Sequence, residues 1–142
     1  MENFGIVGFG GIFFKSENPK ETMAWYKQML GLQTDGKYGA TFEWRSASDP
    51  AKKGSTVWSP FSKNTEYFNP SEKSFMLNFR VKNLELLLVH LKKEGIEQIG
   101  ETAEFEYGKF AWILDPDGIK IELWEPHDES FSEMTEGNTH ST

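Results

Sequence analysis

The chain has 142 residues, of which 37% are hydrophobic and 15% aromatic, enough for the core of one compact domain or of two small modules. Its net charge of −7 and its scattered Lys and Arg argue against a nucleic-acid partner, and the absence of cysteine excludes disulfides, thiolate nucleophiles and cysteine-bound zinc. No apolar run approaches the roughly 20 residues of a membrane helix and no leader peptide is visible, so we expect a cytoplasmic protein without a membrane partner.

The start of the chain predicts a strand followed by a helix. Residues 5–14 combine apolar side chains with four glycines, which is typical of a strand packed closely against another segment. Asn18, Pro19 and Glu21 form an N-terminal capping pattern, so a helix is predicted to begin after Asn18. Gly31 is expected to end it.

Two more strands are predicted before a polar connection. Residues 37–46 alternate apolar and polar side chains, and we expect the apolar set, which includes Phe42 and Trp44, to be buried. Residues 55–60 predict a second, short strand. The polar segment 61–73 is interpreted as a linker between two halves of the chain.

The second half repeats this order. Alternation over residues 74–81 predicts a strand, and Asn83 and Gly95 are expected to cap and to end a second helix. Residues 110–126 then predict a β-hairpin, with Asp-Pro-Asp-Gly at residues 115–118 as its turn.

The second arm of this hairpin carries a strand carboxylate, Glu122. Ile121 and Leu123 are expected to face the core, so alternation turns Glu122 to the other side of the sheet. A strand carboxylate considered alone is usually just solvated.

Matched residues recur in the two halves in the same order. Asn18 and Asn83 lie 65 residues apart, Phe-Glu-Trp at residues 42–44 is matched by Phe-Ala-Trp at 110–112, and Trp-Ser-Pro at 58–60 by Trp-Glu-Pro at 124–126. The repeat predicts an α+β fold of two tandem βαβββ modules. We assign module one to residues 5–60, module two to 74–126, a single domain to 1–126, and a flexible acidic tail, mobile or part of an oligomer contact, to 127–142.

Two motifs in this duplicated plan, AWYKQMLGL at residues 24–32 and DPDGIKIEL at residues 115–123, resemble the vicinal oxygen chelate superfamily. This superfamily includes glyoxalase I, bleomycin-resistance proteins and extradiol dioxygenases. The resemblance covers residues 5–126 and implies two modules whose sheets curl around a cavity, with helices outside. Because such proteins often dimerise, we expect a homodimer.

In metal-using relatives, four strand positions, two from each module, bind a divalent ion, commonly through His or Glu. The resemblance places Gly11, Thr56, Met76 and Glu122 at these positions, and only Glu122 has a good donor. We therefore expect no metal and no other cofactor, with Glu122 as the ligand if a divalent metal does bind. The remaining metal-binding candidates are three histidines expected to be solvated: His90, His127 and His140.

Alternation with Glu122 directed inward predicts a cavity lined by aromatic and charged side chains. The alternative is that the charged residues form ordinary solvated ion pairs and the tryptophans merely pack. The expected ligand-binding residues are Phe13, Lys15, Glu43, Arg45, Trp58, Asn78, Arg80 and Trp124.

Three functions fit these expectations. The favoured one is a binding protein of the bleomycin-resistance type, which holds a small organic molecule between aromatic rings without a metal and favours a cationic group through its carboxylates. The second is an enzyme, a glyoxalase-like lyase or isomerase or a dioxygenase, in which the catalytic residue Glu122 is a general base or a metal ligand. The third is an assembly module that presents exposed aromatics to a protein partner.

Overall fold

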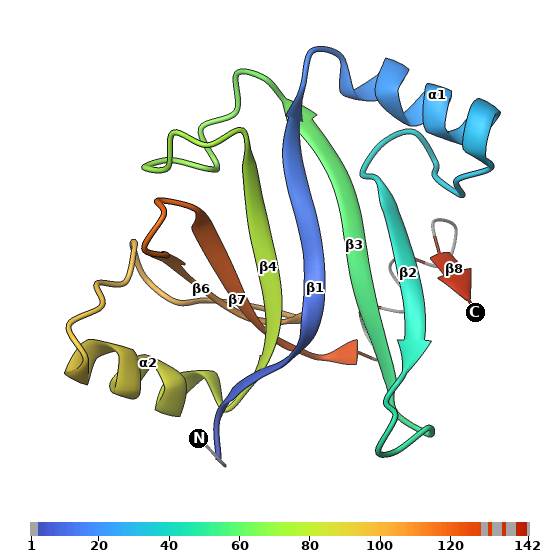
Figure 1. The fold of residues 1–142 in the computed structure, drawn as a ribbon. Helices are drawn as coiled ribbons and strands as arrows, with labels where there is room; N and C mark the ends of the chain where they lie inside the picture. The colour runs from blue at the N-terminus through green and yellow to red at the C-terminus, as the bar shows by residue number, and fades with distance from the viewer. Residues whose placement is uncertain (1–2, 129–130, 132–134, 136–138, 142) are drawn as a thin grey trace.

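The computed structural model of the protein describes residues 3–128, 131, 135 and 139–141, and in these it shows one mixed sheet and two helices (Figure 1). The strand order is β5-β6-β7-β4-β1-β3-β2-β8. No helix among the described residues is long and apolar enough to span a membrane. The elements are β1 (Gly5–Ser16), α1 (Pro19–Leu30), β2 (Ala40–Arg45), β3 (Lys53–Ser62), β4 (Phe75–Lys82), α2 (Leu84–Lys93), β5 (Ala103–Phe105), β6 (Gly108–Leu114), β7 (Lys120–Pro126) and β8 (Thr139–Ser141).

The sheet is built from two similar halves that meet at its centre. β1 and β4 open the two halves and pair with each other in antiparallel fashion, while β3 pairs with β1 and β7 with β4 in parallel. In each half a helix follows the first strand, and an antiparallel pair, β2 with β3 or β6 with β7, extends the sheet outward (Figure 1). The predicted α+β class and the duplicated order of elements are confirmed.

The two halves differ at their outer edges. β5 pairs with β6 at one edge, whereas the corresponding place beside β2 is taken by β8, which comes from the C-terminal segment and runs parallel to β2. We expected no ordered element in that segment, so β8 is a difference from the prediction. The other residues of the predicted tail at 129–130, 132–134, 136–138 and 142 lie outside the described residues.

Both helices begin where the sequence predicts, but only the first uses its predicted cap. The Asn18 side chain accepts a hydrogen bond from the Glu21 N–H at 3.2 Å. Asn83 has a left-handed backbone and makes no capping bond; instead the Glu125 carboxylate, from β7, accepts from the Leu84 N–H at 2.8 Å. A carboxylate at the positive end of a helix stabilises it in the same way as a side-chain cap.

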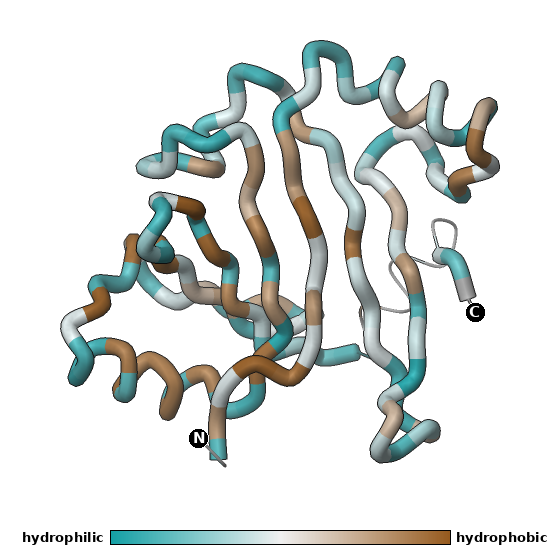
Figure 2. Tube along the Cα trace, in the orientation of Figure 1, coloured by the Kyte–Doolittle hydropathy of each residue, from teal (hydrophilic) through white to brown (hydrophobic). Residues whose placement is uncertain are grey.

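The main apolar core lies between α2 and the outer face of β7. Leu84 and Leu87 of α2 pack with Ile121 and Leu123 of β7 and with Val81, and Figure 2 shows the hydrophobic residues that recur along α2. The hairpin turn keeps this register, because the Asp115 carboxylate accepts from the N–H groups of residues 117 and 119. The predicted core orientation of Ile121 and Leu123 is confirmed.

Candidate functional site

A row of cross-strand partners crosses the face of the sheet that is opposite the helices. Cross-strand partners point to the same side of a sheet, so the row forms the floor of one surface. Above this surface lies a cavity of about 590 Å³. The row consists of Thr41, Val57, Gly11, Asn78, Glu122 and Trp112, on β2, β3, β1, β4, β7 and β6.

Aromatic side chains supply most of the cavity wall. Phe110 stacks on Trp124 at a centroid distance of 5.8 Å, and Phe13 meets Phe61 edge to face at 5.6 Å. Among the described residues that line the cavity, Glu122 is the only charged one. The aromatic lining residues are Phe13, Tyr38, Phe61, Tyr67, Phe105, Tyr107, Phe110, Trp112, Trp124 and Phe131.

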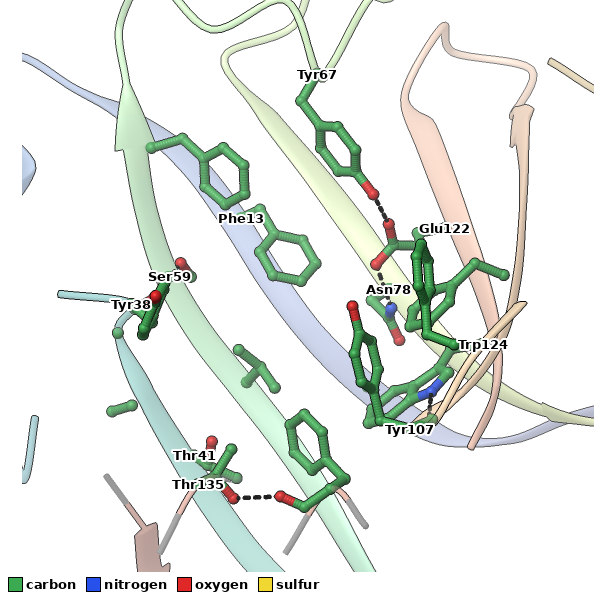
Figure 3. A pocket seen from close by; sticks show the side chains of 18 of the residues that line it. Phe13, Tyr38, Thr41, Ser59, Tyr67, Asn78, Tyr107, Glu122, Trp124 and Thr135 are labelled. Atoms are coloured by element: carbon green, nitrogen blue, oxygen red, sulfur yellow. Dashed lines mark hydrogen bonds between the residues drawn. The ribbon is translucent and has the colours of Figure 1, made fainter. Parts of the chain in front are cut away.

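The Glu122 carboxylate is 4% exposed and accepts three hydrogen bonds. The Asn78 side chain donates to Oε1 at 2.7 Å, and the Trp112 indole donates to Oε2 at 2.8 Å. The Tyr67 hydroxyl also donates to Oε2, as Figure 3 shows. Three donors around two oxygens suit the anionic form of the carboxylate and hold it in one orientation.

Asn78 fills a space that a glycine leaves open. A Cβ atom at residue 10 would lie 1.8 Å from the Asn78 Oδ1, so Gly10 is needed for this position of the amide. Because a carboxylate only accepts hydrogen bonds, the Asn78 amide must turn its nitrogen toward Glu122. Its oxygen then lies beside Gly10. The buried Oδ1 has no hydrogen-bond partner among the described residues.

Tyr67 is held by two residues of β7. The residue is 40% exposed, but its hydroxyl points inward to Glu122. Burial, together with the negative charge of Glu122, raises the pKa of Tyr67 far above its ordinary value, so the phenol stays a proton donor. Lys120 donates to the Tyr67 carbonyl at 2.6 Å, and burial lowers the pKa of this lysine, an effect that Glu122 partly opposes.

The residues at the four metal positions that the resemblance implies do not fit a divalent metal. Gly11 has no side chain, and the Met76 thioether is a poor ligand for hard cations. The Thr56 hydroxyl donates to the Phe9 carbonyl at 2.7 Å and accepts from an indole at 2.9 Å, and the oxygens of Glu122 already accept three bonds. Within the described part of the chain, no three His, Cys, Asp or Glu side chains come together.

Four of the predicted site residues line the cavity: Phe13, Asn78, Glu122 and Trp124. The prediction is wrong for Trp58, whose ring packs on Tyr26 of α1, 4.5 Å away, on the outer face of the sheet. The reason is the register of β3: Gly11 pairs with Val57, so Val57 and not Thr56 shares the face of Glu122. A shift of one residue reverses the side of every residue in a strand.

The predicted charged lining residues are also corrected. Glu43 pairs with Lys53 at 3.8 Å, and Arg45 is exposed. Lys15 lies near the end of β1, beyond the cavity. Arg80 is buried behind Trp124 and bonds to Asp128.

Sequence reasoning missed several residues of the site. Trp112 had a signal, because a hairpin closed at residues 115–118 places it directly opposite Glu122. Tyr67 had none, since it lies in a polar, aperiodic linker. Tyr107 and Phe110 are brought to the cavity by β6 and the turn before it.

Comparison with known proteins gives one family match and several similar folds. The family model described as the Glyoxalase/Bleomycin resistance protein/Dioxygenase superfamily matches residues 12–123. No curated protein matches the chain. The solved structures below share less than 25% identity with it and show the fold alone.

Three similar solved structures illustrate the range. A methylmalonyl-CoA epimerase from Mycobacterium tuberculosis is 15% identical, with a TM-score of 0.54, over 89% of this chain and 93% of that one. A methylmalonyl-CoA epimerase from Streptomyces coelicolor, in complex with 2-nitronate-propionyl-CoA, is 11% identical, with a TM-score of 0.60, over 87% and 99%. A superfamily member from Vibrio splendidus is 12% identical, with a TM-score of 0.50, over 86% and 98%. In all three, the match covers nearly the whole length of the solved chain.

Proposed function

Because the chain belongs to the glyoxalase/bleomycin resistance protein/dioxygenase superfamily, we propose that it binds a small organic molecule in its cavity without a divalent metal. The volume of about 590 Å³ suits such a ligand, and aromatic walls with a few convergent polar groups are the usual form of a ligand site. The observation that carries the proposal is Glu122, a buried carboxylate surrounded by aromatic rings.

The chemistry of this wall selects a flat aromatic molecule with a cationic or N–H donor group. Aromatic faces stack on such a molecule and attract its charge. Oε1 of Glu122 accepts one hydrogen bond, from Asn78, whereas a carboxylate oxygen can accept two. The remaining position accepts a donor from the ligand.

Two aromatic dyes of opposite charge test this selection. Proflavine is a planar aromatic cation, and 1-anilinonaphthalene-8-sulfonate is an aromatic anion. We expect the dissociation constant of proflavine to be lower than that of the anionic dye by a factor of about ten or more, because the buried charge of Glu122 attracts the cation and repels the anion. Equal affinity for the two dyes, measured by equilibrium dialysis, would contradict the proposed ligand chemistry.

One observation favours an enzyme as the second candidate: the Tyr67 hydroxyl lies beside the Glu122 carboxylate, as a general acid lies beside a general base. Two of the similar structures are methylmalonyl-CoA epimerases. If Glu122 is a base for such a carbon acid, incubation with methylmalonyl-CoA in D₂O should exchange the substrate's α-proton, as seen by NMR. If the exchange is no faster than without protein, methylmalonyl-CoA is not a substrate.

A further inference from the structure

An ion pair between a buried arginine and a half-buried aspartate joins the centre of the sheet to the start of the C-terminal segment. The guanidinium of Arg80, from β4, donates to both carboxylate oxygens of Asp128, at 2.7 and 2.6 Å. It lies 5.2 Å from the Trp44 ring and 5.1 Å from the Trp124 ring, and its side chain is 5% exposed. Both bonds come from one guanidinium nitrogen, Nη2, and together with the two aromatic faces they restrict the orientation of Arg80. Asp128 is therefore fixed relative to β4.

Beyond Asp128, two of the described residues of the chain line the cavity. Phe131 packs against Trp124 at a centroid distance of 4.8 Å. Phe131 and Thr135 both line the cavity (Figure 3 labels Thr135). These two residues therefore form a wall that the two modules do not supply.

The far end of the segment is attached to the opposite edge of the sheet. β8 pairs with β2, and the His140 ring stacks on Phe42 at 4.9 Å. The His140 Nε2 also accepts from the Gln33 N–H at 2.7 Å. We call the described residues of this segment the strap: Asp128, Phe131, Thr135 and Thr139–Ser141.

We propose that Arg80 is a positioning residue of the ligand site, because it holds Asp128, the first residue of the strap, whose residues Phe131 and Thr135 line the cavity. The inference rests on the proposed function in one respect, that the cavity is where the ligand binds. Arg80 itself does not line the cavity, so it acts on the ligand only through the strap. The strap then controls how fast a ligand leaves.

Loss of the Asp128 charge should release the strap. Asp128→Asn keeps one acceptor oxygen but no charge, and the other described acceptor near the guanidinium is the neutral Ser55 carbonyl, at 3.5 Å. A buried cation cannot stay unpaired at little cost, so Arg80 would turn toward water. That movement removes the support behind Trp124, against which Phe131 packs.

The first experiment compares Asp128→Asn with Glu17→Gln. Glu17 forms an exposed ion pair with Lys63 at 2.8 Å and serves as the control for loss of one negative charge. We expect proflavine to dissociate about tenfold or more faster from Asp128→Asn than from the wild type, since changes within one binding site act mainly on dissociation. Glu17→Gln should match the wild type in stopped-flow measurements.

A readout without ligand uses acrylamide quenching of tryptophan fluorescence. All variants carry Trp25→Phe, which removes an exposed indole. Trp124 is 2% exposed, so a released strap should increase quenching in Asp128→Asn but not in Glu17→Gln. If proflavine fails to bind the wild type, the proposed ligand chemistry fails, while quenching still tests the strap.

A cross-link at the other end of the strap provides the rescue. Phe42 and His140 are partners in the ladder between β2 and β8, and adjacent strands lie about 4.8 Å apart, within reach of a disulfide. The chain has no cysteine, so Phe42→Cys with His140→Cys introduces one defined pair. In Asp128→Asn, oxidation of this pair should restore slow dissociation, and reduction should abolish it.

Two results would overturn the inference. The first is unchanged dissociation and quenching in Asp128→Asn, and the second is fast dissociation that the cross-link does not slow. If Asp128→Asn does not fold, the test uses the variant that carries Phe42→Cys and His140→Cys with Asp128 intact, and compares proflavine dissociation from its oxidised and reduced forms. Slower dissociation in the oxidised than in the reduced form supports the strap, and equal rates contradict it.

Discussion

The phenol of Tyr67 donates a hydrogen bond to the carboxylate of Glu122, which lies 55 residues further along the chain (Figure 3). Tyr67 belongs to the segment between the two modules, and Glu122 to the last strand of the second. The bond therefore makes the segment between the modules part of the site. It also occupies an oxygen that a metal would need.

Tyr67→Phe should reduce the free energy of unfolding by about 1–2 kcal/mol, because a buried carboxylate loses one of its three donors. Chemical denaturation measures the loss. Tyr38→Phe is the matched control, since the Tyr38 ring is 68% exposed and also borders the cavity. The control should stay within about 0.5 kcal/mol of the wild type, and an equal loss in both variants would show that the bond to Glu122 contributes nothing.

The pH dependence of stability should change in the same variant. The pKa of Tyr67 is raised above its ordinary value of 10.0, so above that pH the unfolded chain loses this proton while the folded chain keeps it. The free energy of unfolding then falls as pH rises past 10. The advantage of the wild type over Tyr67→Phe should be complete at about pH 8 and shrink above about pH 10. Lys120 is present in both chains, so its titration cancels when the two free energies of unfolding are subtracted. A difference that stays constant from about pH 8 to above about pH 10 would therefore contradict the expectation.

The purified protein should retain well under one equivalent of Zn, Ni, Mn or Fe after dialysis. Gly11 and Met76 offer no hard donor at the family's metal positions, and Oε2 of Glu122 already accepts two hydrogen bonds. Elemental analysis by mass spectrometry provides the measurement. Stoichiometric metal that survives dialysis would restore the lyase or dioxygenase candidate.

Local patterns predicted the elements whose causes are local. The helix start at Asn18 follows from a cap and a proline within four residues, and the hairpin turn from Asp115 and Gly118. The side of Ile121 follows from alternation with its own neighbours. Each of these depends on chemistry within a few residues, so each is confirmed.

Features that depend on distant partners were not predicted. The register of β3 is set by its pairing with β1, and an apparent repeat between Trp58 and Trp124 shifted it by one residue. Alternation with Asn78 predicted Arg80 in the ligand site, whereas the partner that it binds, Asp128, lies in a segment that showed no pattern. Tyr67 reaches Glu122 through the folded position of a linker. The periodicity of a single segment does not predict strand register or contacts between residues that are distant in the sequence.

Glu122 and Ile121 are neighbours on β7 that face opposite sides, so substitutions at the two positions separate the ligand site from the core. Ile121 packs with Leu84 and Leu87 of α2, and Ile121→Ala should cost about 2–5 kcal/mol of stability through a cavity. It should leave proflavine affinity within about 0.5 kcal/mol of the wild type, measured where both chains are folded.

Glu122→Gln should weaken proflavine by about 1–3 kcal/mol, because it removes the charge that the ligand pairs with. Alternation alone suggests almost no effect of this change on stability, but the structure shows a carboxylate that is 4% exposed and receives three donors. An amide nitrogen in that place would face a donor, so we also expect a loss of about 1–3 kcal/mol in unfolding. The two variants thus share a stability loss and differ in binding, and proflavine affinity unchanged in Glu122→Gln would retire the site.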